Sequence, residues 1–152
     1  MFKKVLLLSL ILLTLLFSKE KNNSYIKYKI ENNNIETAYM FLKSELLANG
    51  YNIVYEGDFA KLTKKVGKLL NKESKLSFGK KIAFCKGSLS FKLLDENIDN
   101  IVFCPFSIAV YKEKKEAHFY ISYINYKALK KDEKIIKQIN KDIKRIIEKV
   151  IF

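Results

Sequence analysis

The two cysteines of this 152-residue sequence are the side chains that could be chemically reactive or bind a ligand. Cys85 ends a predicted strand, is followed by Lys86, and precedes a predicted helix start at Ser88. A neighbouring ammonium and a helix N-terminus both favour a thiolate, so Cys85 is our candidate for a reactive or ligand-binding thiol. Such a thiol would support redox exchange or the binding of a soft metal. The alternative is a cysteine packed in a loop.

Cys104 lies by alternation on the apolar face of the next predicted strand, beside Pro105, which indicates a small buried hydrophobe. Cys85 points away from the face that carries Ile82 and Phe84 in its own strand. A direct bridge between the two cysteines therefore requires the strand end to bend. An even cysteine count in an exported chain favours a disulfide, so a Cys85 to Cys104 bridge stays an alternative.

Other catalytic groups are scarce in the sequence. It has no Gly-rich phosphate loop, no paired-histidine metal motif and no nucleophile elbow. His118 is the single histidine, and alternation predicts an exposed place on the polar face of a hairpin. The carboxylates Asp95, Glu96 and Asp99 cluster without any mark of catalysis. We therefore expect no cofactor and favour a noncatalytic role over an enzyme.

The elements that position these residues follow from hydrophobic periodicity. Strands are predicted over Tyr25 to Ile30, Tyr51 to Tyr55, Phe78 to Cys85, Ile101 to Tyr111 and Ala117 to Ile124. Helices are predicted from a cap at Asn33 or Asn34 to Gly50, over Phe59 to Leu70, from a cap at Ser88 through Leu94, and from about Asp132 to the end.

Two of these elements carry a further expectation. Ile101 to Tyr111 is the candidate for a central strand, with a bulge or local edge at Pro105, which cannot donate to the ladder. The last helix has an aliphatic stripe that includes Ile139 and Ile143, which we expect to pack across the sheet rather than on a membrane or a partner.

The order of elements is β-α-β-(α)-β-α-β-β-α. Hairpins mixed with helices favour the α+β class, in which a mixed or antiparallel sheet packs with helices in a compact two-layer sandwich.

The N-terminus has the pattern of an export signal. A charged start precedes the apolar run from Val5 to Phe17, which is shorter than the roughly 20 residues of a membrane span. We expect a secretory signal peptide over residues 1–18, a short polar linker over 19–24 and one domain over 25–152. The protein would then be exported, to the periplasm, with an uncleaved N-terminal tether as the alternative.

The formal net charge of +13 is carried almost wholly by lysine, since Arg145 is the single arginine among 29 basic residues. Specific phosphate and base contacts favour the planar arginine fork, so we expect no nucleic acid partner. A weak, salt-sensitive association with an anionic membrane surface is the expected consequence of the charge.

The run IAFCKGSLSFKLLDENIDNIVFCPFSIAVY, residues 82–111, resembles the central signature of the domain of unknown function 302 family. Cys85 matches its first cysteine, Pro105 its strand proline, and Val110 with Tyr111 its final step. The segments 49–51 and 120–125 are similar too, so the resemblance covers most of residues 25–150. Lys86 and Gly87 replace the usual Asn-Pro, and Cys104 precedes the proline where the family often has a cysteine after it.

The resemblance implies a compact sandwich of mixed sheet and helices, with a homodimer as the expected assembly, and it implies no activity. We therefore expect a noncatalytic periplasmic module that binds a small ligand or an envelope protein. The alternative function is a thiol-dependent redox or soft-metal-binding protein acting through Cys85. The candidate site residues are Cys85, Lys86, Ser88, Cys104 and Pro105.

Overall fold

The computed structural model describes residues 19–21, 24–31, 34–126 and 134–151. The predicted signal peptide over residues 1–18 and the predicted start of the last helix near Asp132 lie outside the described residues. No helix among the described residues is long and apolar enough to cross a membrane.

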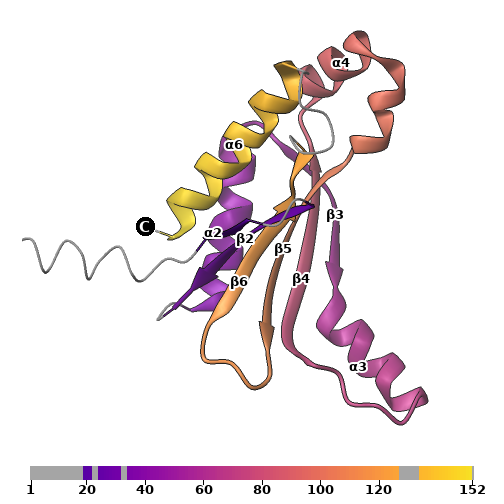
Figure 1. The fold of residues 1–152 in the computed structure, drawn as a ribbon, viewed down its shortest axis with the longest axis vertical. Helices are drawn as coiled ribbons and strands as arrows, with labels where there is room; N and C mark the ends of the chain where they lie inside the picture. Colours follow the sequence, from indigo (N-terminus) through magenta and orange to yellow (C-terminus); the bar gives the residue numbers. More distant parts are fainter. Residues whose placement is uncertain (1–18, 22–23, 32–33, 127–133, 152) are drawn as a thin grey trace, which may run out of the picture.

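Six antiparallel strands form one sheet in the order β1-β2-β6-β5-β4-β3 (Figure 1). The strands are β1 (Lys19–Lys21), β2 (Tyr25–Ile30), β3 (Asn52–Asp58), β4 (Leu76–Cys85), β5 (Phe106–Glu113) and β6 (Phe119–Ile124). Strand β5 lies between β6 and β4, which confirms its predicted central place. Residues 19–21 were expected in a linker, and this was wrong, because their backbone pairs with β2 at the sheet edge.

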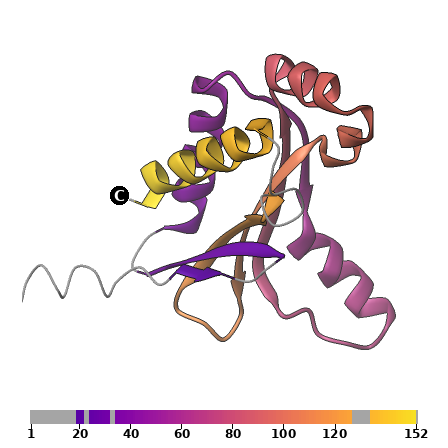
Figure 2. The ribbon, with the colours of Figure 1, turned by 45° about the horizontal axis from the view of Figure 1, so that its top comes forward.

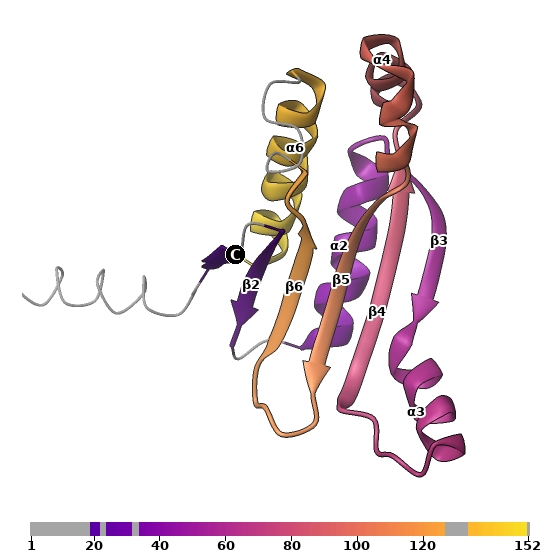
Figure 3. The ribbon, with the colours of Figure 1, turned by 45° about the vertical axis from the view of Figure 1, so that its right-hand side comes forward.

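The helices divide into a covering layer and two end pieces. They are α2 (Ile35–Ala48), α3 (Phe59–Leu69), α4 (Gly87–Glu96), the 3-10 helix η1 (Ile98–Phe103) and α6 (Lys134–Ile151). Helices α2 and α6 cross one another on the same face of the sheet (Figures 1 and 2). Helices α3 and α4 lie instead at opposite ends of β4 (Figure 3). The predicted α+β two-layer sandwich is confirmed.

Local signals explain where the elements begin and end. The side chain of Asn34 accepts a hydrogen bond of 3.0 Å from the backbone N–H of Thr37, which satisfies one of the open donors at the start of α2. Gly50 follows α2 with a φ of +76°, a conformation that glycine adopts without steric cost. At the start of α3, Asp58 caps the backbone N–H of Lys61 in the same way.

The core lies between the sheet and the pair α2 and α6. The aliphatic stripe of α6 is buried, including Ile139 and Ile143, which are fully inaccessible. On the sheet side, Ile82, Phe106 and Ile121 are equally inaccessible, and they belong to the same cluster. This confirms that the last helix packs across the sheet.

Two strand predictions were wrong in detail. Ile101 to Tyr111 is not one strand, because η1 occupies Ile98–Phe103 and β5 begins only at Phe106, after the cis peptide bond between Cys104 and Pro105. Proline cannot donate to a ladder, so the strand starts beyond it. Alternation predicted that Ile53 and Tyr55 share one face of β3. The pairing register with β4 shifts between these two residues, and Tyr55 is exposed.

The packing of α6 leads to a first prediction. Ile143→Asp would bury an unpaired charge in the core, so we expect this variant to fail to fold. Ile143→Ala, measured by denaturant titration, should lower the free energy of unfolding by about 2–5 kcal/mol. The exposed neighbour Lys141→Asp is the control and should stay within about 0.5 kcal/mol of the wild type. A stable Ile143→Asp protein would contradict the buried face.

Candidate functional site

The two cysteines come together where β4 ends and β5 begins. Cys85 is the last residue of β4, and Cys104 caps the C-terminus of η1 just before β5. The thiol of Cys104 lies 3.7 Å from the hydroxyl of Ser90, which belongs to α4. Cys85 interacts with both of these groups. We call Cys85, Ser90, Cys104 and Tyr126 the thiol cluster.

Tyr126 forms the buried floor of the thiol cluster. Its hydroxyl accepts a hydrogen bond of 3.2 Å from the backbone N–H of Ser107, and its ring meets the edges of Phe103 and Phe106. Burial raises the pKa of Tyr126, the Ser107 contacts oppose the rise, and the two thiols add to it. Tyr126 therefore stays a neutral phenol against the thiols at neutral pH.

The predicted activation of Cys85 was wrong. Burial raises the pKa of the Cys85 thiol, and repulsion from and hydrogen bonding to Cys104 raise it further. Contacts with Ser90 and with the backbone of Phe106 act in the opposite direction and are weaker. A raised pKa lowers the thiolate fraction at neutral pH, so Cys85 is not a ready nucleophile.

Lys86 and Ser88 do not join the thiol cluster. The ammonium of Lys86 donates a 2.9 Å hydrogen bond to the carbonyl of Asn49 at the end of α2, and it lies 5.5 Å from the ring centroid of Tyr51. Lys86 is also the N-cap residue of α4, so the prediction that Ser88 caps this helix was wrong. Both residues line a cleft of about 360 Å³ between α4 and α6, which includes Asp142.

The disulfide alternative is not what the structure holds, since Cys85 and Cys104 are both free thiols. Both are half-buried, and Cys104 packs against the edge of the core, so its expected core-facing position is confirmed although its burial is incomplete. Pro105, the remaining predicted site residue, is exposed beside them. Among the described residues there is no group of three or more potential metal ligands.

The single histidine is not an exposed hairpin residue, as alternation predicted, but a half-buried one. Its Nε2 lies 2.6 Å from the hydroxyl of Tyr120 and 3.0 Å from a carboxylate oxygen of Glu116. The ammonium of Lys27 lies 4.2 Å from the centroid of the Tyr120 ring. These contacts hold the hairpin between β5 and β6 in place, and we assign them a structural role.

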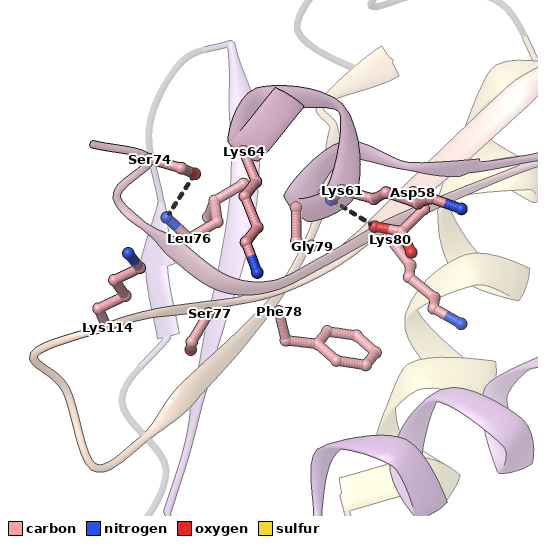
Figure 4. A pocket seen from close by; sticks show the side chains of 11 residues that line it. Asp58, Lys61, Lys64, Ser74, Leu76, Ser77, Phe78, Gly79, Lys80 and Lys114 are labelled. Atoms are coloured by element: carbon pink, nitrogen blue, oxygen red, sulfur yellow. Dashed lines mark hydrogen bonds between the residues drawn. The ribbon is translucent and has the colours of Figure 1, made fainter. Parts of the chain in front are cut away.

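A site that the sequence did not reveal lies between α3 and β4 (Figure 4). It is a hollow of about 400 Å³, which we call the lysine pocket, and it is lined by Lys61, Lys64, Lys80 and Lys114, with Asp58, Ser74, Ser77 and Gly79 among the other residues. Lys64 extends from α3 along β4 toward Gly79, while Lys114 lies at the far end and Lys80 beside Asp58 (Figure 4). The four lysines thus line the pocket from one end to the other, with Lys64 between the two ends (Figure 4).

The four lysines differ in their partners. Lys114 pairs with Glu73, and this pairing lowers the pKa of the exposed Glu73 carboxyl. The ammonium of Lys80 lies 4.9 Å from the ring centroid of Tyr39. Lys61 and Lys64 have no ion-pair partner among the described residues. Lys64 is therefore the ammonium best placed to bind an anion in the pocket.

The floor of the lysine pocket requires small residues. A Cβ atom on Gly79 would lie 2.8 Å from a methyl carbon of Leu76 and 3.3 Å from the backbone nitrogen of Ala60, so glycine lets α3 approach the strand. A second hollow of about 250 Å³ shares Leu76, Gly79 and Lys80 with the lysine pocket and adds Phe59, Ala109 and Tyr111. Charge and apolar surface thus meet along β4.

Comparison with known proteins supports the fold. The profile of the family described as "Domain of unknown function DUF302" matches residues 26–151. A solved structure described as "uncharacterized conserved protein DUF302 from Bacillus stearothermophilus" is similar with a TM-score of 0.63 and 16% identity, over 82% of this chain and 94% of that chain. No curated protein matches the sequence.

The thiol cluster gives a second prediction. Alkylation of Cys85 across pH should show a midpoint above that of an ordinary cysteine, whose pKa is about 8.5, because burial and Cys104 disfavour the thiolate. Cys104→Ser removes one of these causes and should move the midpoint down. Lys86→Gln is the control and should leave it unchanged, since this ammonium binds the Asn49 carbonyl. Faster labelling of Cys85 than of an unstructured thiol would contradict the prediction.

Proposed function

The chain belongs to the DUF302 family, and on that premise we propose that it is a noncatalytic periplasmic module that binds a small anionic ligand in the lysine pocket. The family is described only as a domain of unknown function, so the proposal rests on this chain's own geometry. The observation that carries it is the group of four lysines around one hollow of about 400 Å³. A hollow of this size suits a small molecule.

The surroundings of the lysines indicate the ligand's chemistry. Ammonium groups form charge-assisted hydrogen bonds with phosphate or carboxylate oxygens, and lysine can meet them from several directions. The adjoining hollow with Phe59, Ala109 and Tyr111 offers apolar contact at the same strand. We therefore favour an anion with a small apolar or aromatic portion over an inorganic ion, and a small ligand over an envelope protein at this site.

The periplasmic part of the proposal comes from the charged start and short apolar run of the sequence, which have the pattern of an export signal. The noncatalytic part comes from the scarcity of catalytic motifs in the sequence, as argued above.

The ligand proposal leads to a third prediction. In calorimetric titration, phenyl phosphate should bind more tightly than inorganic phosphate, because its ring reaches the apolar hollow. Lys64→Gln should weaken phenyl phosphate binding about tenfold, since it removes a charge-assisted hydrogen bond. Lys137→Gln makes the same charge change on the exposed surface of α6 and should have no effect. Equal losses in both variants would indicate unspecific attraction by net charge, and no binding of either phosphate would reject the proposal.

A second candidate function is reversible thiol oxidation, which the proximity of Cys85 and Cys104 favours. A small-molecule disulfide would be the oxidant. One thiolate attacks it and releases a reduced thiol, and the second cysteine then displaces the other half, so that two protein thiols become one disulfide and the oxidant becomes two thiols. The raised pKa of Cys85 makes this reaction slow at neutral pH.

The fourth prediction tests this candidate. Incubation with oxidised glutathione at alkaline pH should form a Cys85–Cys104 disulfide within one chain, detected by mass spectrometry of the proteolysed, unreduced protein. Cys104→Ser should instead accumulate a mixed disulfide at Cys85, because the resolving thiol is gone. Mixed disulfides that persist in the wild type would show that the two thiols cannot reach bonding geometry, and would reject a dithiol function.

A further inference from the structure

Helix α3 carries an apolar stripe that the other described parts of the chain leave largely exposed, apart from Phe59 at its start, which borders the apolar hollow. The stripe consists of four side chains of α3 and that of its C-cap residue, and their exposed fractions lie between 39% and 78%: Phe59, Leu62, Val66, Leu69 and Leu70. Their spacing places them on one face of the helix. The buried residue of α3 is Gly67, on a different face. The stripe is therefore available to a partner.

The helix is attached to the domain through its small residues. A Cβ atom on Gly67 would lie 2.4 Å from the carbonyl oxygen of Lys72, so this face touches the chain that leads into β4. The hydroxyl of Thr63 lies 2.7 Å from that of Ser74 on the same side. The apolar stripe is turned away from this packed face by about a quarter turn of the helix. Docking of α3 onto its own domain thus does not use the stripe.

Lysines occupy the opposite side of α3. Lys61, Lys64, Lys65 and Lys68 are all exposed, and no acidic residue lies within the helix itself. Lys61 and Lys64 line the lysine pocket, whereas Lys65 and Lys68 do not. A helix with an apolar face, a lysine-rich face and low overall hydrophobicity is typical of segments that lie in the interface of a membrane.

We propose that α3 docks on an anionic lipid surface, with Leu62, Val66 and Leu69 between the headgroups and the lysines against the phosphates. Charge complementarity favours lipid as the occupant, because the chain has a net charge of +13 and α3 is cationic. The position of α3 fits as well, since it lies at one end of the domain, beyond the start of β4, and the sheet does not shield it (Figures 1 and 3). A helix of 11 residues gives weak, reversible binding.

A second copy of this chain is the alternative partner for the stripe, and the experiment must distinguish it from lipid. The opposite end of the domain has its own exposed apolar side chains, which include Phe91 of α4 and Val102 of η1, and the same two helices carry the exposed carboxylates Asp95 and Asp99. That patch complements α3 in charge, so a head-to-tail contact between copies would also cover the stripe.

The sequence contains no tryptophan, which allows a reporter confined to α3. Leu69→Trp places a single indole at the most exposed position of the stripe. With vesicles of phosphatidylcholine and phosphatidylglycerol, its emission should shift to the blue and be quenched by brominated lipid. Phosphatidylcholine vesicles alone, or high salt, should give no shift. Phe91→Trp reports on the other end and should stay unshifted, so binding through any other segment is recognised.

Matched variants in the Leu69→Trp background then test the two faces. Lys65→Gln with Lys68→Gln should weaken binding to anionic vesicles about fivefold for each lysine. Lys137→Gln with Lys141→Gln, the same change of charge on α6, should have little effect. Leu62→Asp with Val66→Asp should abolish the shift, while circular dichroism and the denaturant midpoint stay as in the parent, because both side chains are exposed.

Three results would overturn the proposal. One is an absence of shift with anionic vesicles. Another is an equal shift of the reporters at positions 69 and 91, which would mean that the protein binds lipid without using α3 as its contact. The last is a shift that grows with protein concentration in the absence of lipid, which would assign the stripe to a second copy of the chain.

Discussion

The burial of one sheet face beneath α2 and α6 is the constraint on which the rest of the structure depends. The stripe of α6 contributes isoleucines that are wholly inaccessible, and each fully buried side chain of this size stabilises the fold by about 1.5–3 kcal/mol. Strand β5 supplies Phe106, Ile108 and Val110 to the same layer, and β4 supplies Ile82 and Phe84. Because the chain enters α6 only after β6, the core closes when the last element docks.

Helix α3 adds no side chain to this core, whereas α4 adds only Leu93, with Leu89 packed against it. Each lies at one end of β4, and each leaves large apolar side chains exposed, such as Leu69 and Phe91. The candidate sites lie in the same places, the lysine pocket beside α3 and the thiol cluster beside α4. The fold therefore combines an apolar centre with two ends that leave more side chains exposed.

The sequence correctly predicted the elements whose hydrophobic pattern fits only one type of secondary structure. Strand β2, helix α2 and helix α6 match their patterns because a cap or an unbroken stripe marks them. The pattern from Ile101 to Val110 failed, since alternating apolar residues before Pro105 fit a short 3-10 helix as well as a strand. That error carried over to the cysteines in part. Cys104 packs against the core as alternation predicted, but it follows η1 rather than lying in a strand, and its thiol lies 3.7 Å from the hydroxyl of Ser90. The lysine pocket had no signal at all, because lysines are spread along the entire chain and only the fold selects four of them.

Helix α3 links the two proposals through its lysines. Lys61 and Lys64 line the pocket, while Lys65 and Lys68 lie on the same cationic side of a helix whose apolar stripe is exposed. An anion held in the pocket would cancel positive charge on the same helix that meets lipid, where each lysine contributes to binding. Linkage requires the effect to be reciprocal, so lipid phosphates near α3 would weaken the affinity of the pocket for its anion by the same factor. The two events would therefore oppose each other, and a bound anion would favour release from the membrane surface, because Lys61 and Lys64 belong both to the pocket and to the cationic side of α3.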